Sequence, residues 1–182
     1  MAALAQLDQA AVERLVAAIL DTHERGGTIF VCGNGGSATT ASHFAQDLTK
    51  STATGPADHH RLRVLALTES VSSLTAWAND LGYDAVFEQQ LRALGRPGDL
   101  LIALSGSGAS PNVLNAVRYA HDADIATFAV TGFDGGPLRR LARDTVHVAT
   151  GQMEIAENAH LVVIHQVVCA VREWKHERDA SG

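Results

Sequence analysis

Short apolar runs alternate with helical patterns along most of the chain, and this alternation restricts the possible folds more than any other feature. Five runs are rich in Val, Ile, Leu and Phe and are nearly continuous, which is typical of parallel strands covered on both faces. We therefore predict an α/β fold, a doubly wound, flavodoxin-like five-stranded parallel sheet flanked by helices. The predicted strands are 28–32, 63–67, 100–104, 125–130 and 145–148, separated by helices at 37–50, 70–78, 84–94, 110–121 and 137–142.

The length and composition fit one globular domain. The chain has 182 residues, of which 46% are hydrophobic and 19% charged, an ordinary balance that argues against disorder. We expect a single domain over 1–182, with an N-terminal helix over about 4–25, a sheet core over about 28–150 and a long C-terminal helix over about 153–175. The irregular stretch 51–60 is predicted to be a loop.

Charge and cysteine usage narrow the classes of function. A formal net charge of -6 argues against general binding to nucleic acid or to anionic membranes. Cys32 and Cys169 lack CxxC spacing, so we expect neither a disulfide framework nor a cysteine-rich zinc site. We find neither the long apolar run of a membrane span nor the pattern of a signal peptide, and we expect a cytoplasmic protein.

A glycine-rich loop, Cys-Gly-Asn-Gly-Gly-Ser, follows the first predicted strand at positions 32–37. Ligands of parallel sheets bind beyond the carboxyl ends of the strands. Glycines let the backbone approach a ligand closely, and a helix N-terminus offers free N–H groups to a phosphate. The loop matches neither the dinucleotide fingerprint nor the Walker loop. Taken alone, it fits a phosphate site or a tight turn without a ligand.

A second loop of this kind, Ser-Gly-Ser-Gly-Ala-Ser, follows the third strand at positions 105–110, and Pro111 begins the next helix. Two such loops after two strands of one sheet strengthen the phosphate interpretation. Neither loop contains Lys or Arg, so backbone N–H groups, hydroxyls and helix dipoles would hold the phosphate. A third glycine-rich loop, 131–136, is interpreted mainly as the start of a helix.

The combined motifs resemble the phosphoheptose isomerases of the sugar-isomerase (SIS) domain superfamily, from about residue 10 to 172. The resemblance implies a SIS-type sheet, a homotetramer with active sites at subunit interfaces, and a phosphosugar substrate. The implied reaction converts sedoheptulose 7-phosphate to D-glycero-D-manno-heptose 7-phosphate through an enediolate. The segments that carry the resemblance are 32–37, 43–45, 78–80, 96–99, 105–110, 131–132 and 134–136.

The resemblance also implies substrate-binding roles for individual residues. Gly106 stands where many family members have threonine. By position, Asn34, Gly35, Gly36 and Ser37 would line the sugar and phosphate pocket, Ser105, Gly106, Ser107 and Ser110 would bind the phosphate, and Asn79 and Asp80 would contact sugar hydroxyls.

Two helices carry residues suited to moving a carbonyl between C1 and C2 of a sugar, which requires a base, an acid and stabilisation of the enediolate. His43 and Asp47 are spaced i, i+4 and so share one helix face. The C-terminal helix carries Glu157, His160 and His165. Two histidines and two carboxylates form a donor set for a divalent metal ion, most naturally zinc.

The family pattern selects His43, Asp47, Glu157 and His165 as metal positions, with Glu157 also binding substrate. It implies that Asp47 is the base and His165 the acid/base partner. Position 47 is commonly Glu in the family, and position 157 is Gln in well-known members. Spacing alone points elsewhere, because Glu157 and His165 lie eight residues apart, about 12 Å along a helix. Glu157 with His160 would be the closer pair, although we interpret His160 as a hydrogen-bonded residue at a subunit interface.

Two other functions remain open at this point. One is isomerisation of another phosphosugar, because the phosphate loops do not read the length of the sugar. The other is a non-catalytic SIS-domain regulator that binds a protein partner. Regulators of that kind lack the histidine pair, whereas this chain has both His43 and His165. The pair favours catalysis.

Overall fold

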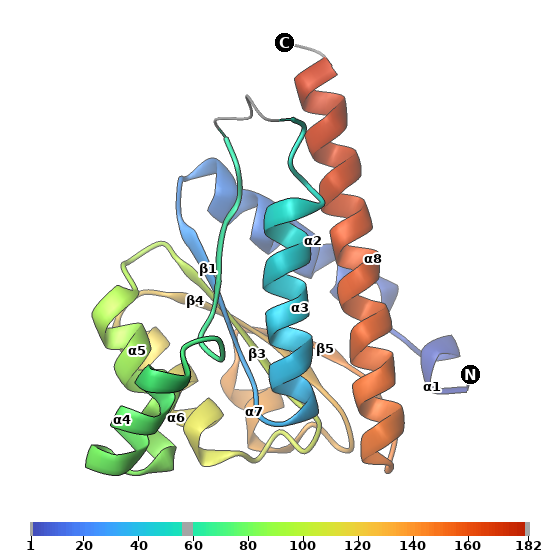
Figure 1. Cartoon of the computed structure of the whole chain (residues 1–182). Helices are drawn as coiled ribbons and strands as arrows, with labels where there is room; N and C mark the ends of the chain where they lie inside the picture. The colour runs from blue at the N-terminus through green and yellow to red at the C-terminus, as the bar shows by residue number, and fades with distance from the viewer. Residues whose placement is uncertain (1, 56–59, 181–182) are drawn as a thin grey trace.

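The computed structural model describes residues 2–55 and 60–180. Its centre is an all-parallel sheet of five strands in the order β2-β1-β3-β4-β5, with helices on both faces (Figure 1). This order is that of flavodoxin-like folds, so the predicted doubly wound α/β architecture is confirmed. Of the predicted loop 51–60, positions 56–59 lie outside the described residues.

The elements follow the predicted alternation of strand and helix. The strands are β1 (Thr28–Cys32), β2 (Arg63–Ala66), β3 (Leu100–Ser105), β4 (Ala126–Thr131) and β5 (Asp144–His147). The helices are α1 (Ala2–Ala5), α2 (Gln9–Glu24), α3 (Gly36–Lys50), α4 (Val71–Leu81), α5 (Val86–Leu94), α6 (Pro111–Asp122), α7 (Gly136–Leu141) and α8 (Met153–Ala180), with the 3₁₀ turn η1 (Tyr83–Ala85).

Two of the predicted helices have different bounds in the structure. The helix expected over about 4–25 is divided into α1 and α2, because Asp8 has an extended backbone and begins α2 as its N-cap. The C-terminal helix α8 continues beyond the predicted end at 175 to Ala180. Both differences concern helix ends, where local sequence is a weak guide.

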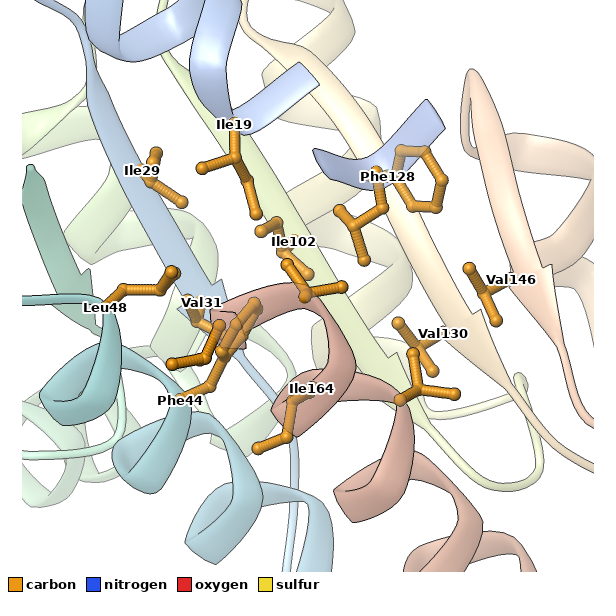
Figure 2. Packing of buried hydrophobic residues seen from close by; sticks show 14 of the residues in the cluster. Ile19, Ile29, Val31, Phe44, Leu48, Ile102, Phe128, Val130, Val146 and Ile164 are labelled. Atoms are coloured by element: carbon orange, nitrogen blue, oxygen red, sulfur yellow. The ribbon is translucent and has the colours of Figure 1, made fainter. Parts of the chain in front are cut away.

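The central strands are buried on both faces, which explains their continuous apolar runs. On β3, Ile102 belongs to the cluster under α2, α3 and α8, and its neighbour Leu101 belongs to the cluster under α5 and α6. Figure 2 shows Phe44 of α3 and Ile164 of α8 among the side chains that cover the first face. This packing fixes α3 and α8 over the same face of the sheet.

The edge strand β2 departs from the prediction. The sequence pattern predicts cover on both faces, but Arg63 and Leu65 are exposed. The reason is that, within the described ranges 2–55 and 60–180, β2 lies at the end of the sheet and pairs with β1 alone. Helix α4, which follows β2, has no buried residue.

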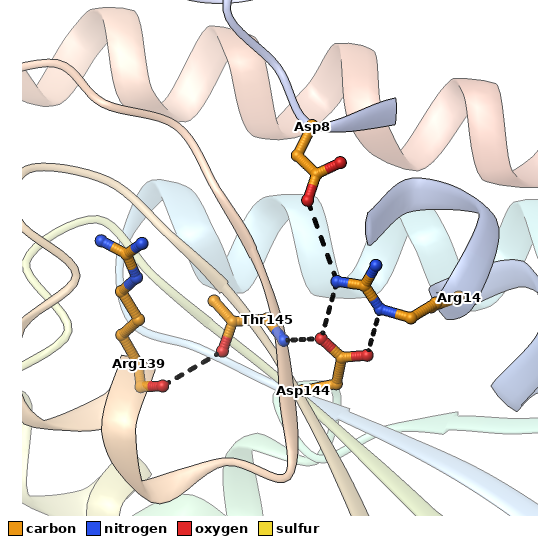
Figure 3. Close-up of polar contacts among 5 residues, drawn as sticks. All are labelled: Asp8, Arg14, Arg139, Asp144 and Thr145. Carbon is orange, nitrogen blue, oxygen red and sulfur yellow. Dashed lines mark hydrogen bonds and ion pairs between the residues drawn. The ribbon is translucent and has the colours of Figure 1, made fainter. Parts of the chain in front are cut away.

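Arg14 ties α2 to the opposite edge of the sheet (Figure 3). Its Nε donates to Asp144 Oδ2 at 2.6 Å, and its Nη2 donates to Asp144 Oδ1 at 3.2 Å. Burial alone would raise the pKa of Asp144, but the hydrogen bonds from Arg14 and from the Thr145 N–H outweigh it and lower that pKa. Because the Arg14 side chain is half exposed, solvent screens the pair and we expect it to contribute little to stability.

His160 points from α8 toward the sheet, which corrects the expectation of a hydrogen-bonded residue at a subunit interface. It is 1% exposed, and neither ring nitrogen has a hydrogen-bond partner among the described residues. Burial lowers its pKa from the ordinary value of 6.5, which the nearby Thr131 backbone only partly opposes. Burial and the positive charge of Arg139 also lower the pKa of His147. The folded protein therefore holds both imidazoles neutral more strongly than the unfolded chain does.

We expect His160 to make the fold sensitive to acid. Below about pH 6.5 the unfolded chain binds more protons than the folded one, so stability falls as the pH is lowered, by up to about 1.4 kcal/mol per pH unit for each histidine. Above about pH 6.5 the histidines are neutral in both the folded and the unfolded chain, so their contribution to stability no longer changes with pH. The substitution His160→Leu should make the slope shallower, as measured by urea unfolding between pH 5 and pH 8. The variant His176→Leu, at an exposed position of α8, should keep the original slope; an unchanged slope in His160→Leu would contradict the assignment.

Within the described residues, no helix combines the length and the apolar character that crossing a bilayer requires.

Candidate active site

Helices α3 and α8 run side by side in the same direction over one face of the sheet (Figure 1). Both begin at the carboxyl edge, because α3 follows β1 and α8 follows β5. Glu157, near the start of α8, lies against Gly36, the first residue of α3. Two turns further along, His165 of α8 reaches His43 and Asp47 of α3. The candidate site thus follows the seam between two parallel helices.

At its lower end, the seam opens into a pocket of about 210 Å³. The two glycine-rich loops meet there because β1 and β3 are adjacent strands of the sheet. None of the described residues that line it is Lys or Arg, and its polar groups are amides, hydroxyls and the carboxylate of Glu157. The lining residues are Asn34, Gly35, Gly36, Ser37, Leu104, Ser105, Gly106, Ser107, Ser110, Met153 and Glu157. All eight loop residues predicted to bind sugar or phosphate therefore share one pocket.

Two glycines in this pocket make room for side chains of α8. A Cβ at position 36 would overlap the carboxylate of Glu157, and one at position 106 would overlap the sulfur of Met153. A threonine at 106 would therefore require Met153 to move. Sequence reasoning missed Met153 as a pocket residue, because its approach to Gly106 depends on how α8 is placed.

His43, Asp47 and His165 form a second cluster, which we call the His–Asp–His group. Asp47 Oδ2 lies 3.2 Å from His43 Nε2 and 3.8 Å from His165 Nε2. The two imidazole rings meet edge to face, with centroids 5.0 Å apart. The side chain of Asp47 is 19% exposed, and those of His43 and His165 are 41% and 47% exposed. The group is therefore supported by packing and still open to a ligand.

The His–Asp–His group could hold a metal ion. One donor atom from each residue lies within 4.8 Å of the others, so the atoms are close enough to share one ion. Two imidazoles and one carboxylate form a donor set that metalloenzymes use when a further position stays open for substrate. The residues present therefore fit a divalent cation such as zinc.

Other predicted residues are not joined to this group. Glu157 lies against Gly36 at the pocket, as its distance from His165 along the helix suggested. The alternative pair of Glu157 with His160 does not form a ligand cluster either, since His160 is buried against the sheet. Asn79 and Asp80 lie near the end of α4, where Asn79 Nδ2 donates to Asp80 Oδ1 at 2.8 Å. Both are exposed and lie outside the pocket lining of this chain.

Sequence reasoning also missed two residues that contact Asn34. Its carboxamide exchanges hydrogen bonds with that of Asn112, on the first turn of α6. The hydroxyl of Tyr83 in η1 donates to Asn34 Oδ1 at 2.8 Å. The only available signal was that Asn112 stands two positions after Ser110, on the helix that follows the second loop.

Comparison with known proteins places the chain among sugar-phosphate enzymes. Residues 1–132 match the SIS domain family. The phosphoheptose isomerase of Chlorobaculum parvum is 41% identical over 91% of this chain and 79% of that protein. The solved phosphoheptose isomerase of Neisseria gonorrhoeae has a TM-score of 0.83 at 35% identity, covering 90% of this chain and 86% of that one. The phosphoheptose isomerase from Francisella tularensis has a TM-score of 0.81 at 30% identity, covering 90% and 85%. The chain therefore belongs to the phosphoheptose isomerase family of SIS-domain proteins.

Proposed function

We propose that this protein is an aldose–ketose isomerase that converts sedoheptulose 7-phosphate to D-glycero-D-manno-heptose 7-phosphate. One observation carries the proposal, namely that a pocket of amides and hydroxyls and the His–Asp–His group lie on the same seam. Gly36 in the pocket and His43 in the group are seven residues apart on α3, about 10 Å along the helix. That separation suits an extended sugar with its phosphate at one end and its reacting carbons at the other.

The pocket holds the phosphate through neutral donors. The N-terminus of α3 presents free backbone N–H groups and a partial positive charge, and Ser37, Ser105, Ser107 and Ser110 add hydroxyls. In this role the backbone comes close to the ligand at Asn34, Gly35, Gly36 and Gly106. Glu157 of α8 forms one wall of the pocket.

The proton transfers fall to Asp47 and His165. Asp47 removes the proton from C1 of the ketose while His165 donates a proton to O2, which gives the enediol. His165 then takes the proton from O1, and Asp47 returns its proton to C2, which gives the aldose. Among the described residues, both histidine contacts of Asp47 use Oδ2, so Oδ1 of the same carboxylate can meet the substrate.

We propose zinc as the cofactor, held by His43, Asp47 and His165. The carboxylate at 157 is a further candidate ligand, which requires its side chain to turn away from Gly36. A bound divalent ion supplies Lewis acidity that stabilises negative charge on the substrate oxygens. In this arrangement Asp47 holds the two imidazoles in place, and the exposed side of the group receives the sugar.

We further propose a homotetramer with active sites at subunit interfaces, working in the cytoplasm. Helix α4 has no buried residue in the isolated chain, and Val71, Leu81 and Tyr83 on or beside it are exposed. Contact between subunits would cover these side chains and would let Asn79 and Asp80 approach the sugar in a neighbouring site. Cys32 and Cys169 are free thiols, and Cys169 is exposed, which suits a reducing compartment.

The proposed function is tested by an aldose–ketose interconversion assay on pentose, hexose and heptose phosphates, with and without a chelator. We expect turnover of sedoheptulose 7-phosphate, with a weaker rate on shorter sugars and loss of rate in the chelator. Preferred turnover of a shorter phosphosugar would reassign the substrate. Absence of turnover on every phosphosugar, with a stoichiometric protein partner recovered by pull-down, would favour the non-catalytic regulator instead.

A further inference from the structure

We propose that Asn112 is a positioning residue that locks the two phosphate-binding loops together through Asn34. The proposal rests on the function proposed above, because it concerns the pocket that receives the phosphate. Asn112 is itself absent from the lining of that pocket. It stands on the first turn of α6, directly after the second loop, and it acts on the ligand through Asn34 of the first loop.

The contact between the two residues is a closed pair of carboxamides. Asn34 Nδ2 donates to Asn112 Oδ1 at 2.8 Å, and Asn112 Nδ2 donates to Asn34 Oδ1 at 2.9 Å. Reversal of either amide would set donor against donor and acceptor against acceptor, so the pair accepts a single relative orientation. Asn112 Oδ1 also accepts the N–H of Val113 at 3.0 Å, which fixes its end of the pair to α6.

The two ends of the pair differ in burial and in surroundings. Asn112 is 1% exposed, so its carboxamide depends on protein partners rather than on water. Asn34 lies between Gly33 and Gly35, and Gly35 has a φ of +54°. A backbone flanked by glycines gains little stiffness from its own side chains. The tether to Asn112 therefore restricts the motion of this loop.

Tyr83 supplies a second restraint on the same atom. Its hydroxyl donates to Asn34 Oδ1 at 2.8 Å, so this oxygen accepts hydrogen bonds from both Tyr83 and Asn112. Because this oxygen accepts two hydrogen bonds from the protein, the Asn34 side chain holds the loop in place. Rigid loops bind more tightly because less conformational entropy is lost on binding.

The test measures affinity separately from catalytic rate. In Asn112→Ala we expect the KM for sedoheptulose 7-phosphate and the dissociation constant of inorganic phosphate to rise together by about tenfold, the size of one lost buried hydrogen bond, while kcat changes by less than about twofold. Tyr83→Phe should shift both constants in the same direction but less. Asn115→Ala is the matched control, one turn along α6, where the side chain donates to the Asp84 carbonyl instead.

A double-mutant cycle separates this role from general stability. Because the two carboxamides act as one unit, Asn34→Ala combined with Asn112→Ala should weaken phosphate binding no more than either single change. Additive losses, unchanged phosphate affinity, or losses equal to those of Asn115→Ala would overturn the proposal. If Asn112→Ala does not fold, as judged by its thermal melt, Asn112→Asp and Tyr83→Phe give the same comparison.

The binding measurements also distinguish failure of the isomerase proposal from failure of the Asn112 proposal. Phosphate binding is measured by calorimetry without turnover, so a wild-type protein that binds phosphate but isomerises nothing would reject the enzyme and leave the positioning role open to measurement. A wild-type protein that does not bind phosphate would overturn both.

Discussion

Replacement of Asp47 by Asn is expected to lower kcat for the heptose phosphate by between about a hundredfold and ten-thousandfold, the usual contribution of a general base. The amide has nearly the same shape as the carboxylate but cannot accept the C1 proton. It also removes the negative charge that faces His43 and His165. Steady-state kinetics give the rate, and exchange of the C1 hydrogen with deuterated water, followed by NMR, reports the proton transfer itself.

Two comparison variants make the Asp47 result specific. Asp122→Asn removes an exposed carboxylate at the end of α6 and should leave kcat unchanged. Asp47→Glu keeps a carboxylate and should retain more activity than Asp47→Asn. If Asp47→Asn isomerises the substrate at the wild-type rate, the assignment of this residue as the base is wrong.

Replacement of His165 by Ala is expected to have two effects at once, a loss of turnover of similar size and weaker retention of metal. The imidazole is both the proposed acid/base group and one of three donors within 4.8 Å of one another. Elemental analysis after loading with zinc and desalting should find about one equivalent in the wild type and clearly less in the variant. Treatment of the wild type with a chelator should remove the same ion.

The controls for His165 use other histidines of the chain. His176→Ala, at an exposed position of the same helix, should keep both the zinc and the activity. His43→Ala should lose zinc while His165 still stands beside Asp47, so a lower rate in His165→Ala than in His43→Ala measures the proton transfer apart from the metal. Full activity together with one equivalent of zinc in His165→Ala would refute both of its assigned roles.

Local sequence was sufficient for the sheet and for the two loops. Strands buried on both faces leave continuous apolar runs, as at β3 and β4, and glycine-rich turns before helices are recognisable where they occur. The same reasoning failed at β2, because a run of residues does not reveal that its strand lies at the edge of the sheet. It also missed the break between α1 and α2, which Asp8 marks.

The candidate site also combines features that the sequence predicted with features that only the tertiary structure revealed. From the sequence alone came the α/β fold, the pairing of His43 with Asp47 on one helix face, and the convergence of two glycine-rich loops, since each follows from spacing within an element or from the rule that parallel strands end at one edge. The family resemblance implied that His165 meets Asp47, and the structure brings them together. Only the tertiary structure decided that Glu157 lies against Gly36, that His160 faces the sheet and that Asn112 pairs with Asn34. These contacts join residues from separate elements, and their geometry is set by how α3, α6 and α8 pack on the sheet. That packing depends on the whole core, and no local pattern encodes it.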